Sequence, residues 1–203
     1  MTTGLLHLSA ARLFVLIVGL WSVGTLVSAL VATLAVAGWP IPGPLVPALL
    51  VLAALARAAA RIIVVLWLAR IATGLVRERR RGRLDDATNL SIASGYLAAH
   101  SLAVCVLPVL ARFDLPGAGA AGYVAANAMQ FGVFALASYV LLAYKAAVRL
   151  EVAEGYDATS VASRWRDWLG FLVFAVGLWW LQPRVRAAVG RGQEVAIEDH
   201  LVS

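Results

Sequence analysis

Two arginines, Arg57 and Arg61, stand in an otherwise apolar stretch and are the side chains best suited to bind a charged group. Their spacing of four places both on one face of a helix. If that helix crosses a bilayer over residues 47–69, Arg61 lies about 13 Å and Arg57 about 20 Å from the inner interface. Each arginine at such a depth costs roughly 2.5–3.5 kcal/mol unless another group compensates it. The pair is therefore our first candidate for a ligand-binding or partner-binding site.

A second register of the same helix leaves neither arginine deeply buried. If the membrane covers residues 57–76, Arg57 is at the outer boundary, Arg61 is one turn deeper, and Arg70 extends towards the inner surface. That register leaves the apolar run 45–56 outside the hydrocarbon, which requires strong tilt or a re-entrant segment. We favour the first register, because intramembrane ionisable residues are by default site candidates.

The apolar segments contain no carboxylate at that depth. Other groups therefore have to offset the cost of burying the two arginines. His100 lies about 20 Å from the inner interface, and Asn127 and Gln130 lie in the outer half of the fourth span. The candidates are backbone carbonyls, these three side chains, an anionic ligand or lipid, or an acidic residue of a partner protein.

His100 is also a candidate ligand for haem or a proton carrier, because neutral imidazole binds metals and titrates near neutrality. The other histidines, His7 and His200, lie in the terminal regions, so no bis-histidine pair spans two helices. A hydrogen-bonded structural histidine is the more ordinary explanation. The sequence has no HExxH, GxSxG or phosphate-binding loop, and its single cysteine, Cys105, lies in an apolar run. We therefore expect no enzyme and no metal site, and leave the cofactor open.

The composition predicts a membrane protein. The chain of 203 residues is 62% hydrophobic and 14% charged, with a mean hydropathy of +0.86, well above an ordinary soluble domain. Four spans of about 20 residues fill most of it. We predict one all-α integral membrane domain over residues 1–203, a polytopic bundle with spans at about 13–37, 47–69, 87–111 and 123–148.

The basic residues predict the orientation of these spans. The densest group lies between the second and third spans, and basic residues near span ends stay in the cytoplasm. The linker 38–44 is uncharged and is placed outside, so the N-terminus is predicted to be cytoplasmic. Besides setting the topology, this group is our candidate site for binding acidic lipid headgroups, an attraction of roughly 1 kcal/mol per basic residue. Its members are Arg77, Arg79, Arg80, Arg81 and Arg83. The net charge of the chain is +6. Its basic residues lie at span ends without interleaved aromatic residues, which argues against the binding of nucleic acid.

Small residues mark two candidate faces for close helix packing. Gly24, Ser28 and Ala32 recur every four residues in the first span, and Gly132 lies on a similar face of the fourth. Such stripes let a second helix approach closely. Small residues are also common in membrane helices in general, so the pattern alone leaves the neighbouring helix unspecified.

A fifth apolar segment, residues 168–183, is ambiguous. Its length is about 24 Å as a helix, short of the roughly 30 Å hydrocarbon core. Four crossings place 14 basic residues inside and one outside, whereas a fifth crossing changes these counts to 11 and four. We favour four crossings with this segment interfacial or re-entrant, and keep a fifth crossing as the alternative.

Two stretches resemble a family of uncharacterised bacterial four-span membrane proteins. Residues 75–90 carry the basic cluster, Gly82 and an Asn-containing helix start, and residues 147–161 carry an acidic motif like the one that closes that family. The family usually has an aromatic residue where Leu84 stands, and it ends near the closing motif, whereas this chain continues. The resemblance implies the topology and a bacterial inner membrane, and it transfers no activity.

The sequence therefore predicts a non-enzymatic accessory or binding subunit that packs against other membrane subunits, a second copy of itself, lipids or pigments. One alternative is a transporter or channel module in which Arg57 and Arg61 attract an anion. Another is a membrane anchor that holds haem or quinone at His100.

Overall fold

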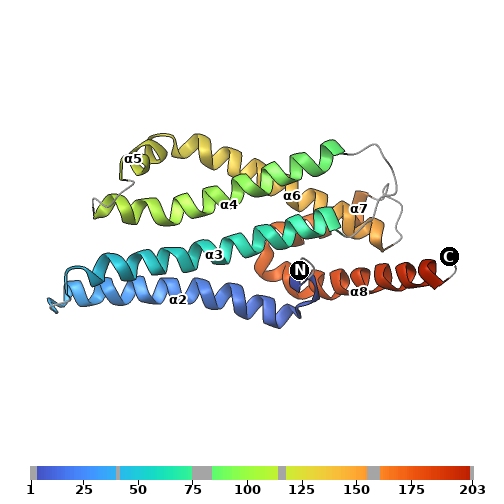
Figure 1. The fold of residues 1–203 in the computed structure, drawn as a ribbon, viewed down its shortest axis with the longest axis horizontal. Helices are drawn as coiled ribbons and strands as arrows, with labels where there is room; N and C mark the ends of the chain where they lie inside the picture. Colours follow the sequence, from blue (N-terminus) through green and yellow to red (C-terminus); the bar gives the residue numbers. More distant parts are fainter. Residues whose placement is uncertain (1–3, 40–41, 75–83, 114–117, 155–160, 202–203) are drawn as a thin grey trace. The chain divides into compact units, whose positions relative to one another are not determined.

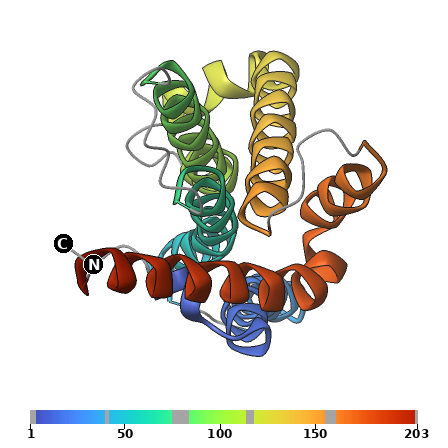
Figure 2. The same ribbon diagram turned by 90° about the vertical axis from the view of Figure 1, so that its right-hand side faces the viewer.

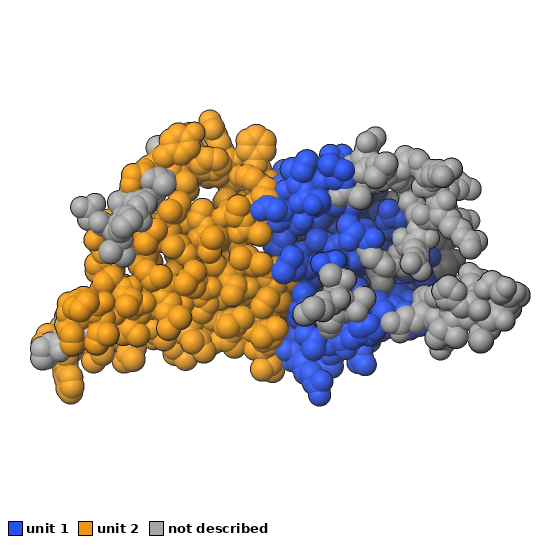
Figure 3. Space-filling view, viewed as in Figure 1, with its two compact units in different colours: residues 1–14, 65–95, 137–203 blue, residues 15–64, 96–136 orange. Residues whose placement is uncertain are grey.

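The computed structural model describes residues 4–39, 42–74, 84–113, 118–154 and 161–201. These residues form helices, with no strand among them, so the all-α prediction is confirmed (Figure 1). The chain divides into two compact units (Figure 3). Unit 1 comprises residues 1–14, 65–95 and 137–203, and unit 2 comprises residues 15–64 and 96–136.

Four helices are long and apolar enough to cross a membrane, as predicted. They are α2 (Ala10–Val36), α3 (Leu45–Gly74), α4 (Leu84–Arg112) and α6 (Ala128–Ala153). The first three follow the predicted spans closely. The protein is therefore a multi-pass membrane protein by the length and composition of its helices.

The predicted fourth span, residues 123–148, is interrupted near its start. A short helix, α5 (Ala118–Ala126), ends before Asn127, and α6 begins at the next residue. The side-chain amide of Asn127 donates to the Tyr123 carbonyl at 2.9 Å, the same oxygen that accepts the Asn127 backbone N–H at 3.2 Å. Side chains that bond nearby backbone compete with regular helix geometry. The span consequently begins later than predicted and extends to Ala153.

The turn after α2 shows why that helix ends where it does. Gly38 has a φ of 70°, a left-handed conformation that glycine adopts without steric cost. The Trp39 N–H donates to the Leu34 carbonyl at 3.1 Å, and the Gly38 N–H donates to the Ala35 carbonyl at 3.3 Å. This pair of bonds is a Schellman cap, which satisfies the last carbonyls of the helix.

The ambiguous fifth segment forms a helical hairpin in unit 1. It comprises the end of α7 (Val161–Leu172) and the start of α8 (Phe174–Leu201). The chain bends by 116° at the break between these two helices (Figure 2). The two helices touch closely where they meet, because a Cβ built on Gly177 would overlap the carbonyl of Gly170. Residues 168–183 are therefore not one straight helix.

The charged residues on either side of this segment are in contact. Arg184 donates to Asp167 with Nη1–Oδ1 at 2.7 Å and Nη2–Oδ2 at 2.9 Å. A crossing of the hydrocarbon would separate the two side chains by roughly 30 Å. Arg184 also donates to Glu154, just beyond α6, with Nε–Oε1 at 2.7 Å. The two ends of residues 168–183 therefore lie beside each other and beside the end of α6, and by length and composition the bent pair of α7 and α8 is a broken span or a re-entrant loop.

The core of unit 1 holds the hairpin in place through aromatic and amide contacts. Trp67 of α3 and Phe171 of α7 are fully buried, with ring centroids 5.6 Å apart. The Trp67 indole donates to Gln182 Oε1 at 2.8 Å, and the Gln182 amide donates to the carbonyl of Leu8 at 2.6 Å. Gln182 thus joins α3, α8 and the chain after the four-residue helix α1 (Gly4–His7).

Topology can be tested by labelling single cysteines with a membrane-impermeant reagent. We expect cysteines at Gly82 and Val202 to be labelled from one side of the membrane, and a cysteine at Gly43 from the other. The reason is that the Asp167–Arg184 contact brings the two ends of residues 168–183 together, which favours a re-entrant segment over a fifth crossing. Labelling of Gly43 and Val202 from the same side would contradict the re-entrant hairpin.

The ion network should contribute strongly to stability. Arg184→Met leaves Asp167, which is 0% exposed, without its cation. We expect a loss of about 3–5 kcal/mol in the free energy of unfolding, typical of an uncompensated buried charge. The exposed Arg186 is the matched control on the same helix, and Arg186→Met should change stability by less than about 0.5 kcal/mol. Reversible unfolding in mixed micelles measures both, and equal effects would contradict the network's role.

Candidate partner-binding site in unit 2

Arg57 lies against α2, which supplies the compensation that the sequence left open. Its Nη1 donates to the carbonyl of Gly24 at 3.1 Å and to the hydroxyl of Ser28 at 2.7 Å. The Ser28 hydroxyl in turn donates to the same Gly24 carbonyl at 2.9 Å. Among the predicted candidates, backbone carbonyl is therefore the group that Arg57 uses.

Gly24 is a point of close approach between α2 and α3. A Cβ at this position would lie 2.6 Å from the Ala53 carbonyl oxygen and 2.8 Å from Cγ of Arg57. Both distances are shorter than real Cβ contacts, so no side chain fits. The predicted stripe of small residues thus faces α3 at Gly24 and Ser28, whereas Ala32, two turns beyond Gly24, is exposed.

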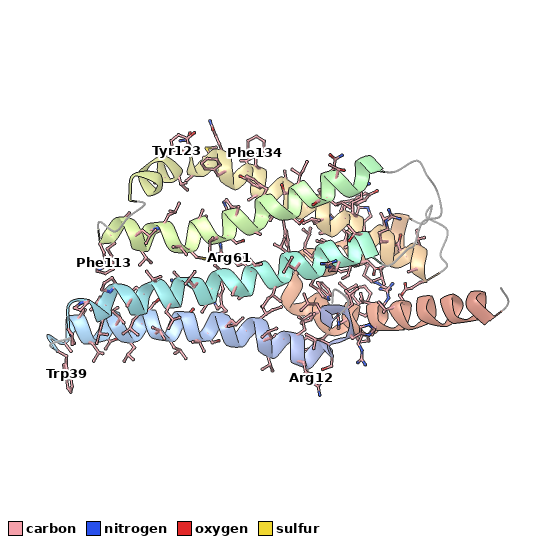
Figure 4. All side chains as sticks on the ribbon, viewed as in Figure 1. Arg12, Trp39, Arg61, Phe113, Tyr123 and Phe134 are labelled. Carbon is pink, nitrogen blue, oxygen red and sulfur yellow. The ribbon has the colours of Figure 1, made fainter. Side chains whose placement is uncertain are left out.

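Arg61 lies about midway along α3 (Figure 4), one turn from Arg57, and its surroundings differ. Its guanidinium carbon is 5.4 Å from the centroid of the Trp21 ring, a cation–π contact with α2. The described residues of unit 2 include no aspartate or glutamate, and Arg61 makes no salt bridge there. Arg61 is half-buried, so its charge is partly accessible to another group.

His100 lies on α4 within the electrostatic range of Arg61. Its ring stacks on Tyr96 with centroids 6.1 Å apart, and the Tyr96 hydroxyl donates to the Phe131 carbonyl at 2.9 Å. Ser101, the next residue, is buried. In the described part of the chain, no group of three or more histidine, cysteine, aspartate or glutamate residues could hold a metal ion.

The remaining predicted site residues are not drawn to the arginines by any bond among the described residues. Asn127 uses its amide locally on Tyr123, and Gln130 is exposed. A Cβ on Gly132 would meet no atom within 4 Å, so the structure places no helix against that glycine. The five candidate headgroup arginines between α3 and α4 lie outside the described residues.

Two aromatic residues of this site were not singled out from the sequence. Trp21 and Tyr96 lie in apolar runs where an aromatic residue is ordinary. Of the two, only Trp21 could have been found from the sequence, because it precedes Gly24 by three residues and shares its helix face.

The chain was compared with known proteins. No family model matches it, and no similar curated protein or solved structure was found.

The close approach of α2 and α3 can be tested with a pair of glycines in one helix. Gly24→Ala forces its Cβ against the Ala53 carbonyl, and we expect a loss of about 1–3 kcal/mol in stability, typical of overpacking. Gly19 is the matched control, since a Cβ there meets nothing within 4 Å. Gly19→Ala should be neutral or stabilising, because alanine has the higher helix propensity. Thermal unfolding in detergent measures both, and equal stabilities of the two variants would contradict the close approach.

Proposed function

We propose that the protein is a non-enzymatic integral membrane subunit that packs against a second membrane protein, with Arg61 facing an acidic side chain of that partner. The observation that supports this is the difference between the two arginines. Arg57 is bonded to Gly24 and Ser28, whereas Arg61 has the ring of Trp21. A ring face stabilises a cation by about 0.5–2 kcal/mol, less than the roughly 2.5–3.5 kcal/mol cost of an intramembrane arginine.

An acidic side chain of a partner protein would offset the part of this cost that the Trp21 ring does not. Charged residues within membranes usually pair with one another or with backbone carbonyls. The described residues of unit 2 contain no acid that serves this purpose. A cytoplasmic N-terminus and a bacterial inner membrane belong to the same proposal. The basic group between α3 and α4 supports the orientation, and the resemblance of residues 75–90 and 147–161 to bacterial four-span proteins supports the location.

The partner can be detected by isolating the full chain from its native membranes with a mild detergent and weighing the complex by native mass spectrometry. We expect Arg61→Leu to lose the partner, because the acidic group then has no cation. Arg61→Lys should retain it. Arg70→Leu is the control, because Arg70 is exposed near the end of the same helix.

Two results would contradict this function. One is a wild-type protein that carries no second protein, and the other is an Arg61→Leu variant that keeps its partner at the wild-type ratio. Thermal unfolding of each variant distinguishes loss of the partner from loss of the fold.

A second candidate function is anion handling, favoured by two arginines one turn apart with no acid among the described residues of unit 2. In proteoliposomes that contain only this chain, halide or phosphate flux that disappears with Arg61→Leu would support it. Flux that is absent from the wild type, together with a partner that depends on Arg61, favours the accessory subunit. An absorption spectrum of the same sample tests for haem at His100 or for a bound pigment.

A further inference from the structure

The helix α7 has two faces with different surroundings. Asp167 and Phe171, four residues apart, are fully buried within unit 1. Trp165, Leu169 and Val173, also four residues apart, are 56%, 50% and 55% exposed. Residues at this spacing share one helix face, and the Val173 N–H continues the helical bonding by donating to the Leu169 carbonyl at 2.8 Å. The result is an exposed apolar stripe, which we call the α7 stripe: Trp165, Leu169 and Val173.

The depth of the stripe follows from its neighbour in α6. The Tyr139 hydroxyl donates to the Phe171 carbonyl at 3.0 Å. Tyr139 lies about 21 Å along α6 from the end of that helix at Ala153, at about 1.5 Å per residue. The end of α7 that carries Phe171 therefore lies within the apolar length of α6, while the end that carries Asp167 lies beside the ion network.

The shallow end of the stripe carries positive charge. Arg166 is exposed, and its guanidinium carbon is 4.5 Å from the centroid of the Trp180 ring. A guanidinium stacked on a ring keeps its N–H groups directed outwards at the edge, where they match phosphate oxygens. Arg186 of α8 is exposed as well. The surface thus changes from cationic, through tryptophan, to aliphatic as it goes deeper.

This order of residues matches one leaflet of a bilayer. Phosphates lie outermost, tryptophan prefers the interface between headgroups and chains, and aliphatic side chains prefer the acyl region. A partner protein would not require the cation, the indole and the aliphatic residues to follow one another along the depth axis. The occupant that fits best is therefore lipid.

We propose that the α7 stripe is a lipid-docking surface embedded in the leaflet on the side where α6 ends, with Arg166 binding the phosphate of an anionic lipid. The hairpin then anchors unit 1 in that leaflet without crossing the bilayer. This proposal does not depend on Arg61 or on a partner protein.

Spin labels test the occupant directly. The full chain with Cys105→Ala is placed in nanodiscs of phosphatidylcholine and phosphatidylglycerol, and a nitroxide is attached at Leu169→Cys or Val173→Cys. Collision rates with oxygen, which concentrates in acyl chains, and with a water-soluble nickel chelate are then measured. We expect an oxygen-to-nickel ratio several-fold higher at both positions than at Arg186→Cys, the exposed control, and highest at Val173, the deepest.

Three outcomes are distinguishable at the stripe. A high ratio supports lipid. Low collision rates with both reagents show that protein covers the stripe, a second copy in this purified sample, and a dominant nickel rate shows that it faces water. Either of the last two would overturn the proposal, and agreement between the two label positions guards against a local disturbance.

The phosphate contact has its own test, with the label at Leu169. Replacing phosphatidylglycerol by phosphatidylcholine should lower the oxygen-to-nickel ratio in the parent protein, and Arg166→Gln should lower it in the mixed nanodiscs. Arg166→Lys, which keeps the charge, should restore most of the ratio. A ratio that changes with neither the lipid nor the substitution would overturn the assignment of Arg166.

Discussion

The contact between Arg184 and Asp167 is the interaction on which the bend between α7 and α8 depends. The two residues flank a segment apolar enough to enter a membrane, and their side chains meet at 2.7 Å. Isolated burial of either charge costs several kcal/mol, and mutual attraction offsets this only when the geometry is good and further hydrogen bonds are made. Here Glu154 supplies the further bonds. Its bond to Arg184, opposed in part by burial, raises the pKa of the guanidinium, so the cation persists at any ordinary pH.

The Trp180 ring links this ion network to both arms of the hairpin. The ring of Trp180 lies 5.1 Å from the guanidinium carbon of Arg184 and 4.5 Å from that of Arg166. One side chain of α8 therefore contacts cations from both arms of the hairpin. Opening the hairpin would separate the Asp167–Arg184 ion pair and remove the contact between Arg166 and Trp180, so both interactions stabilise the bend.

Unit 2 stabilises its half-buried arginine, Arg57, in a different way. The described residues of unit 2 include no carboxylate, and a carbonyl and a hydroxyl on α2 accept hydrogen bonds from the guanidinium. Those acceptors are within reach because Gly24 has no side chain to hold the helices apart. The glycine thus permits two things at once, the close approach of α3 and access to the carbonyl. This also explains why the pattern of small residues and the arginine belong together although 33 residues separate them.

The sequence was sufficient for those features that depend on one helix at a time. Long apolar runs predicted the four candidate spans, since apolar length is a property of each segment alone. The features that it missed depend on contacts between segments or on one rotamer. The break at Asn127 depends on how a single amide is turned, and Gly24 and Gly132 give the same signal although only Gly24 has a helix against it. The charge count favoured four crossings without showing that Asp167 and Arg184 meet.

The same reasoning separates the two intramembrane arginines, which the sequence could only treat as a pair. Their spacing put them on one face and gave them one set of candidate partners. In the structure, one turn of helix is enough to move the guanidinium from a carbonyl and a hydroxyl to an indole ring. Arg57 has hydrogen bonds that offset its burial and is explained by the α2–α3 contact. Arg61 has only the weaker contact with the Trp21 ring, although its charge costs a similar free energy to bury. The proposed acidic group of a partner would supply the remaining stabilisation.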